Sequence, residues 1–175
     1  MIDTLKDVKN SLVLFPPVNL EEEFKSASMS EFKTKDINGK EVTEDVIKKY
    51  DLTMVNVWAT WCSYCVEEMP ELQSLYKKLP KNVNMITICT DGDTKAKEAK
   101  ELLNKSKAEF TTLVKCDELN ENVIDYITGY PTTFFVDKKG KVVGHLQVGT
   151  PSEDGKDNEK GYRQLIDQAL KEVKR

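Results

Sequence analysis

The chain contains 175 residues, with 26 Lys and Arg against 30 Asp and Glu, one His and four Cys. This length is enough for one domain with its own hydrophobic core. A formal net charge of −4 provides no basic surface of the kind that neutralises phosphates, which argues against nucleic-acid binding. A single histidine excludes multi-histidine metal sites, and any Ser–His–Asp site would have to be built on His145.

The N-terminal region is predicted to be an extension of the domain. It has no basic segment followed by an apolar core, as a signal peptide would, although a chain cut after a signal or anchor would begin in the same way. No stretch of the sequence has the 18 or more apolar residues that a membrane span needs. Apolar residues spaced by three or four predict a short helix over residues 2–14, before Pro16, unless this segment is only a tether. We therefore predict an N-terminal extension or tether over residues 1–29 and one domain over residues 30–175.

Strands that alternate with helices follow this extension. Phe32–Ile37 and Lys40–Val42 flank Asn38–Gly39, which predicts a hairpin with a type I′ turn. Thr43 is expected to cap a short helix that ends near residue 50. Leu52–Trp58 is apolar with little alternation, as expected for a strand covered on both faces.

The remaining elements complete an α/β pattern. A helix kinked at Pro70 is expected, then two further strands separated by a helix, a short helix, a β-hairpin, a mobile polar loop and a final amphipathic helix. Their predicted ranges are 62–79, 83–90, 94–106, 110–115, 119–126, 132–136 with 141–147, 149–161 and 162–173. This order predicts a sheet whose central strands are parallel and buried between helices.

Two cysteines separated by two residues, Cys62 and Cys65, lie where the first buried strand meets the following helix. The free backbone N–H groups and the helix dipole favour an anion at a helix N-terminus, so we expect the Cys62 thiolate to be stabilised. Cys65, one turn further along, should be less exposed, and the spacing allows a reversible disulfide. Half of a zinc site and a purely structural disulfide are the alternatives. The isolated Cys89 and Cys116 disfavour zinc, and the short loop disfavours a staple.

The residues around this pair resemble the thioredoxin superfamily, and within it the TlpA/ResA-like thiol–disulfide oxidoreductases. The segments that carry the resemblance are residues 56–65, residues 67–70 and Gly129–Asp137, and it extends over residues 30–173. It implies a thioredoxin-like α/β fold: a central mixed β-sheet flanked by helices, with an N-terminal β-hairpin and a central helix–strand insertion. It also implies a cis peptide bond between Tyr130 and Pro131 that exposes the Tyr130 backbone to a substrate strand. An ordinary trans turn at Pro131 is the alternative.

An acid–base group is implied by the same resemblance. Asn56 stands where cytosolic thioredoxin has a buried aspartate, and an amide cannot transfer a proton. Glu68 follows Cys65 by three residues, as in the TlpA/ResA-like group, and three residues along a helix place two side chains on one face. Glu68 would take and return the Cys65 proton, with its pKa raised by desolvation. A surface charge is the alternative for Glu68, because glutamate is usually exposed.

The other two cysteines, Cys89 and Cys116, end the second and third strands. Free cysteine is usually buried, so inert core thiols are the default expectation for both. If the two strands are neighbours, the sulfurs reach the same end of the sheet and could form a disulfide in an oxidising compartment. His145 lies in the last hairpin and receives no role.

The predicted function is reduction of protein disulfides through Cys62 and Cys65, with no cofactor or metal beyond this cysteine pair. Trp61 would cover the site, and Ser63 and Tyr64 would lie against the substrate together with Tyr130 and Pro131. The resemblance implies an extracytoplasmic protein, membrane-tethered in its full length and re-reduced by a membrane electron donor. We expect a monomer that acts on protein substrates. A disulfide-forming oxidase or isomerase of the same fold, and a binding module with a structural cysteine pair, are the alternatives.

Overall fold

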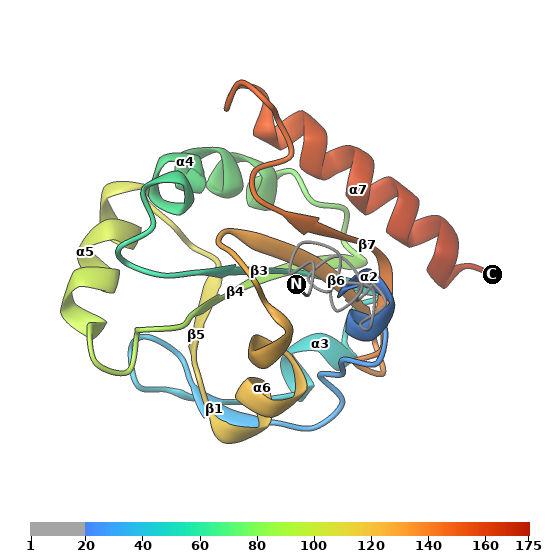
Figure 1. Cartoon of the computed structure of the whole chain (residues 1–175), viewed down its shortest axis with the longest axis horizontal. Coiled ribbons are helices and arrows are strands. Elements are labelled where there is room, and N and C mark those ends of the chain that lie inside the picture. Colours follow the sequence, from blue (N-terminus) through green and yellow to red (C-terminus); the bar gives the residue numbers. More distant parts are fainter. Residues whose placement is uncertain (1–19) are drawn as a thin grey trace, which may run out of the picture.

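A mixed sheet of five strands forms the centre of the fold in the computed structural model, which describes residues 20–175 (Figure 1). The strand order is β5-β4-β3-β6-β7, with β3, β4 and β5 parallel and β6 and β7 antiparallel to their neighbours. Every residue of β3 is buried, as its continuous apolar sequence predicts for a central strand. The strand bounds are Leu52–Trp58 (β3), Val83–Cys89 (β4), Thr111–Val114 (β5), Thr132–Asp137 (β6) and Val142–Val148 (β7).

Helices cover both faces of this sheet. On one face α4, α5 and α7 pack over alternate β3 residues such as Met54 and Trp58, and on the other α2, α3 and α6 pack over Val55 and Val57. The helix bounds are Leu20–Phe24 (α2), Asp45–Lys48 (α3), Ser63–Lys77 (α4), Ala96–Lys105 (α5), Asp117–Asn122 (α6) and Asn158–Val173 (α7), with a 3₁₀ turn at Ile124–Tyr126. The helix–strand unit α5–β5 places β5 at one edge of the sheet. The thioredoxin-like α/β fold class is therefore confirmed.

The N-terminal hairpin forms as predicted, but its turn is of another type. Strands β1 (Lys33–Lys35) and β2 (Glu41–Thr43) pair in the antiparallel sense. In the loop between them only Gly39 has a positive φ, of 87°, whereas a type I′ turn also requires one at Asn38. Two contacts explain the difference: the Asp36 carboxylate accepts the backbone N–H groups of Asn38 and Lys40, and the Ile37 N–H donates to Thr112 O at 2.8 Å.

Two other local predictions are corrected. Glu44 rather than Thr43 is the N-cap residue of α3, and the Thr43 hydroxyl accepts only a long 3.4 Å contact from the backbone of Asp45. The predicted polar loop over 149–161 is shorter, because α7 already begins at Asn158. Helix α4 continues through Pro70. The helix predicted over residues 2–14 lies outside the described residues.

Candidate active site

The cysteine pair lies at the junction between the buried strand β3 and helix α4. Cys62 is the N-cap residue of α4, and its sulfur accepts the backbone N–H of Cys65 at 3.3 Å. The two cysteines form a disulfide with Cα atoms 5.3 Å apart. Their side chains are buried, Cys65 more completely than Cys62, at 1% and 5% exposure. Cys62 is thus the more exposed of the two, and an anion on its sulfur would be stabilised by the N-terminus of α4.

The loop before Cys62 is held to the end of the neighbouring strand β4. The Asp91 carboxylate accepts both the backbone N–H and the hydroxyl of Thr60. The Thr90 N–H donates to Trp58 O at 2.9 Å. Burial opposes ionisation of Asp91, but the Thr60 hydrogen bonds keep its pKa below the ordinary value. These contacts fix the backbone that presents Cys62.

The loop before β6 faces the cysteine pair from the side of Trp61. The peptide bond between Tyr130 and Pro131 is cis. The Trp61 and Tyr130 rings meet edge to face with centroids 5.6 Å apart. The Gly149 N–H donates to Pro131 O at 2.7 Å, which ties the end of β7 to the same loop. These contacts hold three separate parts of the chain together, around Trp61, Tyr130 and Gly149.

Exposed apolar side chains gather at this place. Trp61 and Tyr64 are both 67% exposed and flank Cys62 in the sequence, and Ser63 between them is also exposed. Val148 is 50% exposed and pairs with Thr132 at the start of β6. These are the large hydrophobic side chains that are exposed among residues 22–175, and their clustering marks a contact surface.

Glu68 is a buried group, with 1% of its side chain exposed. Asn56 Nδ2 donates to Glu68 Oε1 at 3.1 Å, and Tyr162 Oη donates to Glu68 Oε2 at 2.8 Å. Burial raises the pKa of Glu68 to about 7, although the hydrogen bonds from Tyr162 and Asn56 act in the opposite direction. A carboxyl that titrates near neutral pH, one helical turn from Cys65, is suited to proton exchange.

Sequence analysis missed two members of this site, Tyr162 on α7 and Thr133 on β6. Tyr162 is fully buried and lies 94 residues from its partner Glu68. Thr133 pairs with Asn56 across β3 and β6, and its hydroxyl accepts from Asn56 Nδ2 at 3.1 Å. The available signal was a tyrosine on the apolar face of the last helix, because a buried tyrosine hydroxyl usually has a partner.

The two remaining cysteines are free thiols. Cys89 packs in the hydrophobic cluster that contains Cys62 and Cys65, whereas Cys116 packs against the cluster on the opposite face of the sheet. The neighbouring strands β4 and β5 thus bring them to one end of the sheet without pairing them. Burial, followed by the Asp91 carboxylate, raises the pKa of the Cys89 thiol far above its ordinary value. Desolvation also raises the pKa of Cys116, so both are unreactive compared with a redox-active thiol.

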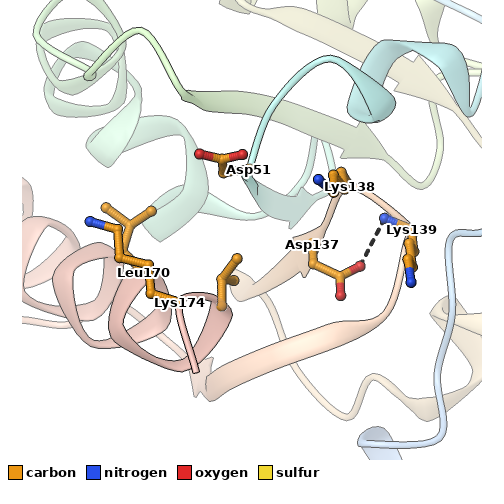
Figure 2. Close-up of a pocket in the computed structure, with 7 residues that line it drawn as sticks. Asp51, Asp137, Lys138, Lys139, Leu170 and Lys174 are labelled. Atoms are coloured by element: carbon orange, nitrogen blue, oxygen red, sulfur yellow. Dashed lines mark hydrogen bonds between the residues drawn. The ribbon is translucent and has the colours of Figure 1, made fainter.

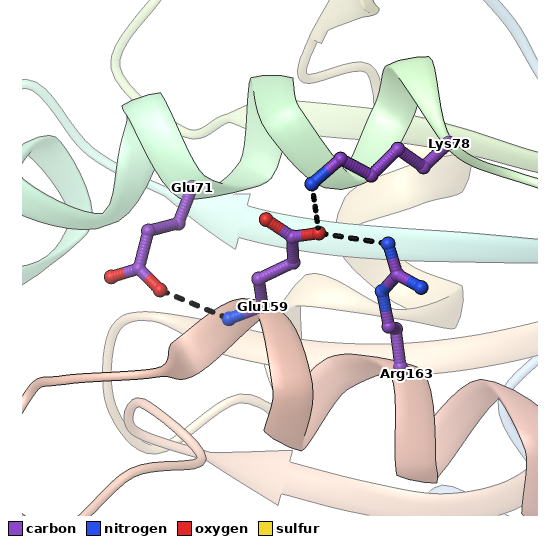
Figure 3. Close-up of polar contacts among 4 residues, drawn as sticks. All are labelled: Glu71, Lys78, Glu159 and Arg163. Carbon is purple, nitrogen blue, oxygen red and sulfur yellow. Dashed lines mark hydrogen bonds and ion pairs between the residues drawn. The ribbon is translucent and has the colours of Figure 1, made fainter.

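Helix α7, which carries Tyr162, is fastened to α4 by polar contacts (Figure 3). Glu71 on α4 accepts the backbone N–H of Glu159 at 3.0 Å. The Glu159 carboxylate in turn accepts from Lys78 at 2.8 Å and from Arg163 at 2.9 Å. These contacts fix the first turns of α7 beside the helix that carries Cys65 and Glu68.

Two cavities differ in their relation to the cysteines. One of about 360 Å³ is lined by Glu68, Tyr64 and the 150–158 segment, and so adjoins the site. Another, also about 360 Å³, lies between Asp51, Asp137 and the C-terminal turns of α7 (Figure 2). Since Leu52 and Asp137 pair at the far end of β3 from Cys62, this second cavity is about 20 Å from the disulfide, the length of a seven-residue strand.

Residues 20–175 contain no group of three or more His, Cys, Asp or Glu arranged to hold a metal ion. Within the same residues, no helix combines the length and apolar character that crossing a bilayer requires.

Comparison with known proteins identifies the family. Residues 26–145 match the AhpC/TSA family. The chain is 31% identical over 136 residues to thiol-disulfide oxidoreductase ResA of Bacillus cereus, covering 77% of this chain and 74% of ResA. It is 30% identical over 99 residues to thioredoxin-like protein YneN of Bacillus subtilis, covering 55% of this chain and just over half, 56%, of YneN. A thioredoxin-family thiol:disulfide interchange protein from Chlorobium tepidum has the same fold, with a TM-score of 0.67, 23% identity and coverage of 83% and 97% of the two chains. The chain therefore belongs to the AhpC/TSA family and is a thioredoxin-like thiol–disulfide oxidoreductase whose redox group is its own cysteine pair.

Proposed function

We propose that this oxidoreductase reduces disulfides in protein substrates outside the cytoplasm. The observation that carries the proposal is the combination of a disulfide at the N-terminus of α4 with a buried carboxyl, Glu68, one turn beyond Cys65. A structural staple would need neither an activating helix terminus nor a neighbouring group that titrates near pH 7.

The reaction starts from the dithiol form. The Cys62 thiolate attacks one sulfur of the substrate disulfide, and that S–S bond breaks as the mixed disulfide forms. The displaced substrate sulfur leaves as a thiolate and takes up a proton. Glu68 then accepts the proton of the Cys65 thiol, and the resulting thiolate attacks Cys62 Sγ and expels the second substrate sulfur. Glu68 returns its proton to this sulfur, whereas the first substrate sulfur takes its proton from solvent. The substrate gains two electrons and two protons, and the Cys62–Cys65 disulfide forms.

The substrate would lie over the exposed apolar cluster beside the disulfide. Trp61, Ser63 and Tyr64 form one side of this surface, and Tyr130 and Pro131 form the other. A substrate segment paired with the Tyr130 backbone as an added strand would place its disulfide above Cys62. The flat aromatic side chains favour a polypeptide over a small solute, because they provide contact area without an enclosing pocket.

Location, electron donor and oligomeric state belong to the same proposal. The resemblance to TlpA/ResA-like proteins supports a monomer that acts outside the cytoplasm, is tethered to the membrane in its full length and is re-reduced by a membrane electron donor. Labelling whole cells of the native host with a membrane-impermeant maleimide tests the location. Labelling of Cys62 only after lysis would contradict an extracytoplasmic site.

The midpoint potential of the cysteine pair decides the direction of electron flow. Equilibration with glutathione buffers should give a value near that of thioredoxin, about −270 mV, and not near that of the oxidant DsbA, about −120 mV. A value at the oxidising end would replace the reductase with a disulfide-forming oxidase. Cys65→Ala should trap a mixed disulfide between Cys62 and its substrate, and Cys116→Ala serves as the matched control because that thiol is remote from the site. A Cys65→Ala variant that traps no protein would contradict the proposed substrate class.

A further inference from the structure

Four side chains form a closed ring of hydrogen bonds behind the cysteine pair. Each comes from a different element: Asn56 from β3, Glu68 from α4, Thr133 from β6 and Tyr162 from α7. Asn56 donates to Glu68 and to Thr133, both at 3.1 Å. Thr133 donates to Tyr162 at 3.5 Å, the longest contact of the ring, and Tyr162 donates to Glu68 at 2.8 Å. All four side chains are 1% exposed or less.

The direction of every hydrogen bond in this ring follows from two of its members, the Asn56 NH2 group, which donates, and the Glu68 carboxylate, which accepts. The Asn56 NH2 group can only donate, and it directs its two N–H bonds to Glu68 and Thr133. Because Thr133 Oγ1 accepts from Asn56, its own proton is directed to Tyr162 Oη. The Tyr162 proton is then left for Glu68 Oε2. Each carboxylate oxygen therefore accepts a hydrogen bond from the ring. Within the ring, neither oxygen faces a group that is free to accept a hydrogen bond from a protonated carboxyl.

This polarity determines where Glu68 can bind a proton. Each carboxylate oxygen has a second lone pair that the ring does not use. Glu68 also lines the 360 Å³ cavity beside Tyr64, and Cys65 precedes it by one turn on the same helix. A proton added to Glu68 can therefore be carried on a lone pair that the ring leaves free.

We propose that Tyr162 is a positioning residue for the redox reaction, which orients the Glu68 carboxyl and stabilises its ionised form from the last helix of the fold. The proposal rests on the function proposed above, in which Glu68 exchanges a proton with Cys65. Tyr162 touches no reacting sulfur in this scheme and acts through Glu68. Its place is fixed by the contacts of Glu71 and Glu159 that fasten α7 to α4 (Figure 3).

Other charged groups around Glu68 act in the opposite direction to Tyr162. The Glu71 carboxylate on α4 raises the pKa of Glu68. Further carboxylates face the shared cavity from α4 and from the segment before α7, and these are Glu67, Glu153 and Asp154. Burial and the surrounding negative charge both raise the pKa of Glu68, whereas the hydrogen bonds donated by Asn56 on β3 and Tyr162 on α7 lower it. Removing one of these donors should therefore raise the pKa of Glu68.

The test compares Tyr162→Phe with Tyr76→Phe. Tyr76 is a partly buried tyrosine of α4 that packs edge to face against Phe110, outside the ring. The titration of Glu68 is followed by carboxyl ¹³C NMR in the oxidised protein, and that of Cys65 by thiolate absorbance in the reduced protein. Tyr162→Phe should raise the midpoint of Glu68 by about one pH unit, the effect of losing one hydrogen bond to a charged group. Tyr76→Phe should leave it in place.

The outcomes separate this proposal from the proposed function. An unchanged Glu68 midpoint in Tyr162→Phe overturns the role of Tyr162, even if Glu68→Gln shifts the Cys65 titration as the proposed function requires. An unchanged Cys65 titration in Glu68→Gln overturns the proton transfer, while the Glu68 midpoint still reports on Tyr162. If Tyr162→Phe does not fold, Thr133→Val replaces it, because it removes the hydroxyl that donates to Tyr162. Thr133→Val should give a smaller upward shift, and no shift overturns the proposal.

Discussion

Replacement of Glu68 by Gln should remove most of the pH dependence that this buried carboxyl imposes on stability. The folded protein holds the pKa of Glu68 at about 7, against an ordinary value of 4.5. Between these two values the unfolded chain has already released the proton that the folded protein retains. The free energy of unfolding therefore falls as pH rises through this range and levels off above pH 7.

The magnitude follows from the two pKa values. From about pH 5 to about pH 8 the contribution of Glu68 should lower the free energy of unfolding by about 2.5 kcal/mol, at 1.36 kcal/mol per pH unit of full linkage. The side chain is 1% exposed, so solvent screening does not reduce this figure appreciably. Gln keeps the size of the side chain and its carbonyl oxygen can still accept from Asn56, but its NH2 group meets the Tyr162 hydroxyl that donates to Glu68, so that one contact has to rearrange in both pH conditions alike.

Urea unfolding of the oxidised protein at the two pH values measures this effect. The wild type should lose about 2.5 kcal/mol more than Glu68→Gln between them. Glu101→Gln is the matched control, since it replaces an exposed carboxylate on α5, outside the cavity that Glu68 lines, and it should behave as the wild type. Parallel losses in the wild type and Glu68→Gln would refute the view that Glu68 ionises against burial.

Three further results are expected. Glu71→Ala should cost about 1 kcal/mol, the usual effect of losing a helix cap, and should speed hydrogen exchange of the Glu159 N–H; unchanged exchange would argue against capping across helices. Iodoacetamide should modify Cys116 before Cys89 in the native protein, since Cys89 is buried and its pKa is raised much further. Mass spectrometry of peptides measures the order of modification, and the reverse order would contradict this expectation. Asp91→Asn should flatten the decline in stability at acid pH, because the pKa of Asp91 is held below its ordinary value and its stabilisation is lost as pH falls through that pKa. Acid titration followed by circular dichroism measures the decline, and an unchanged acid midpoint would contradict the expected role of Asp91.

The parts of the molecule that sequence predicted well are those set by local pattern. Strand β3 was evident as a continuous apolar run, and the cysteine pair was evident from its spacing at a strand–helix junction. Glu68 was indicated by the resemblance to TlpA/ResA-like proteins, and its burial is set by the packing of α4. The contact between Tyr162 and Glu68 was not predicted, because Tyr162 lies on α7, and a local sequence pattern does not indicate contacts between helices that are distant in sequence.

Two wrong local predictions, one of a turn type and one of a helix start, have the same physical origin. The hairpin turn near Asn38 was assigned from a dipeptide preference, but the Asp36 carboxylate and a bond to the β5 backbone determine its conformation. Helix α7 starts four residues before the predicted position. Its N-cap residue Asp157 makes no side-chain cap, and Glu71 on α4 caps the helix instead. In each case a tertiary partner supplies what the local sequence lacks.

Asn56 is a neutral donor to the Glu68 carboxyl of α4, so that only one of these two buried side chains can ionise. The substitution Asn56→Asp tests this arrangement. The change would place a second carboxyl about 3 Å from Glu68, and two carboxylates at that distance cannot both ionise in a buried site, so the pair should share one proton well above neutral pH. Stability should then decline more steeply with rising pH than in the wild type, as measured by urea unfolding. Adding Glu68→Gln to Asn56→Asp should restore much of the loss, since only one carboxyl remains, and this coupling in a double-mutant cycle is the critical result. Additive effects of the two substitutions would mean that Asn56 is present for packing alone and not as a neutral donor to the Glu68 carboxylate.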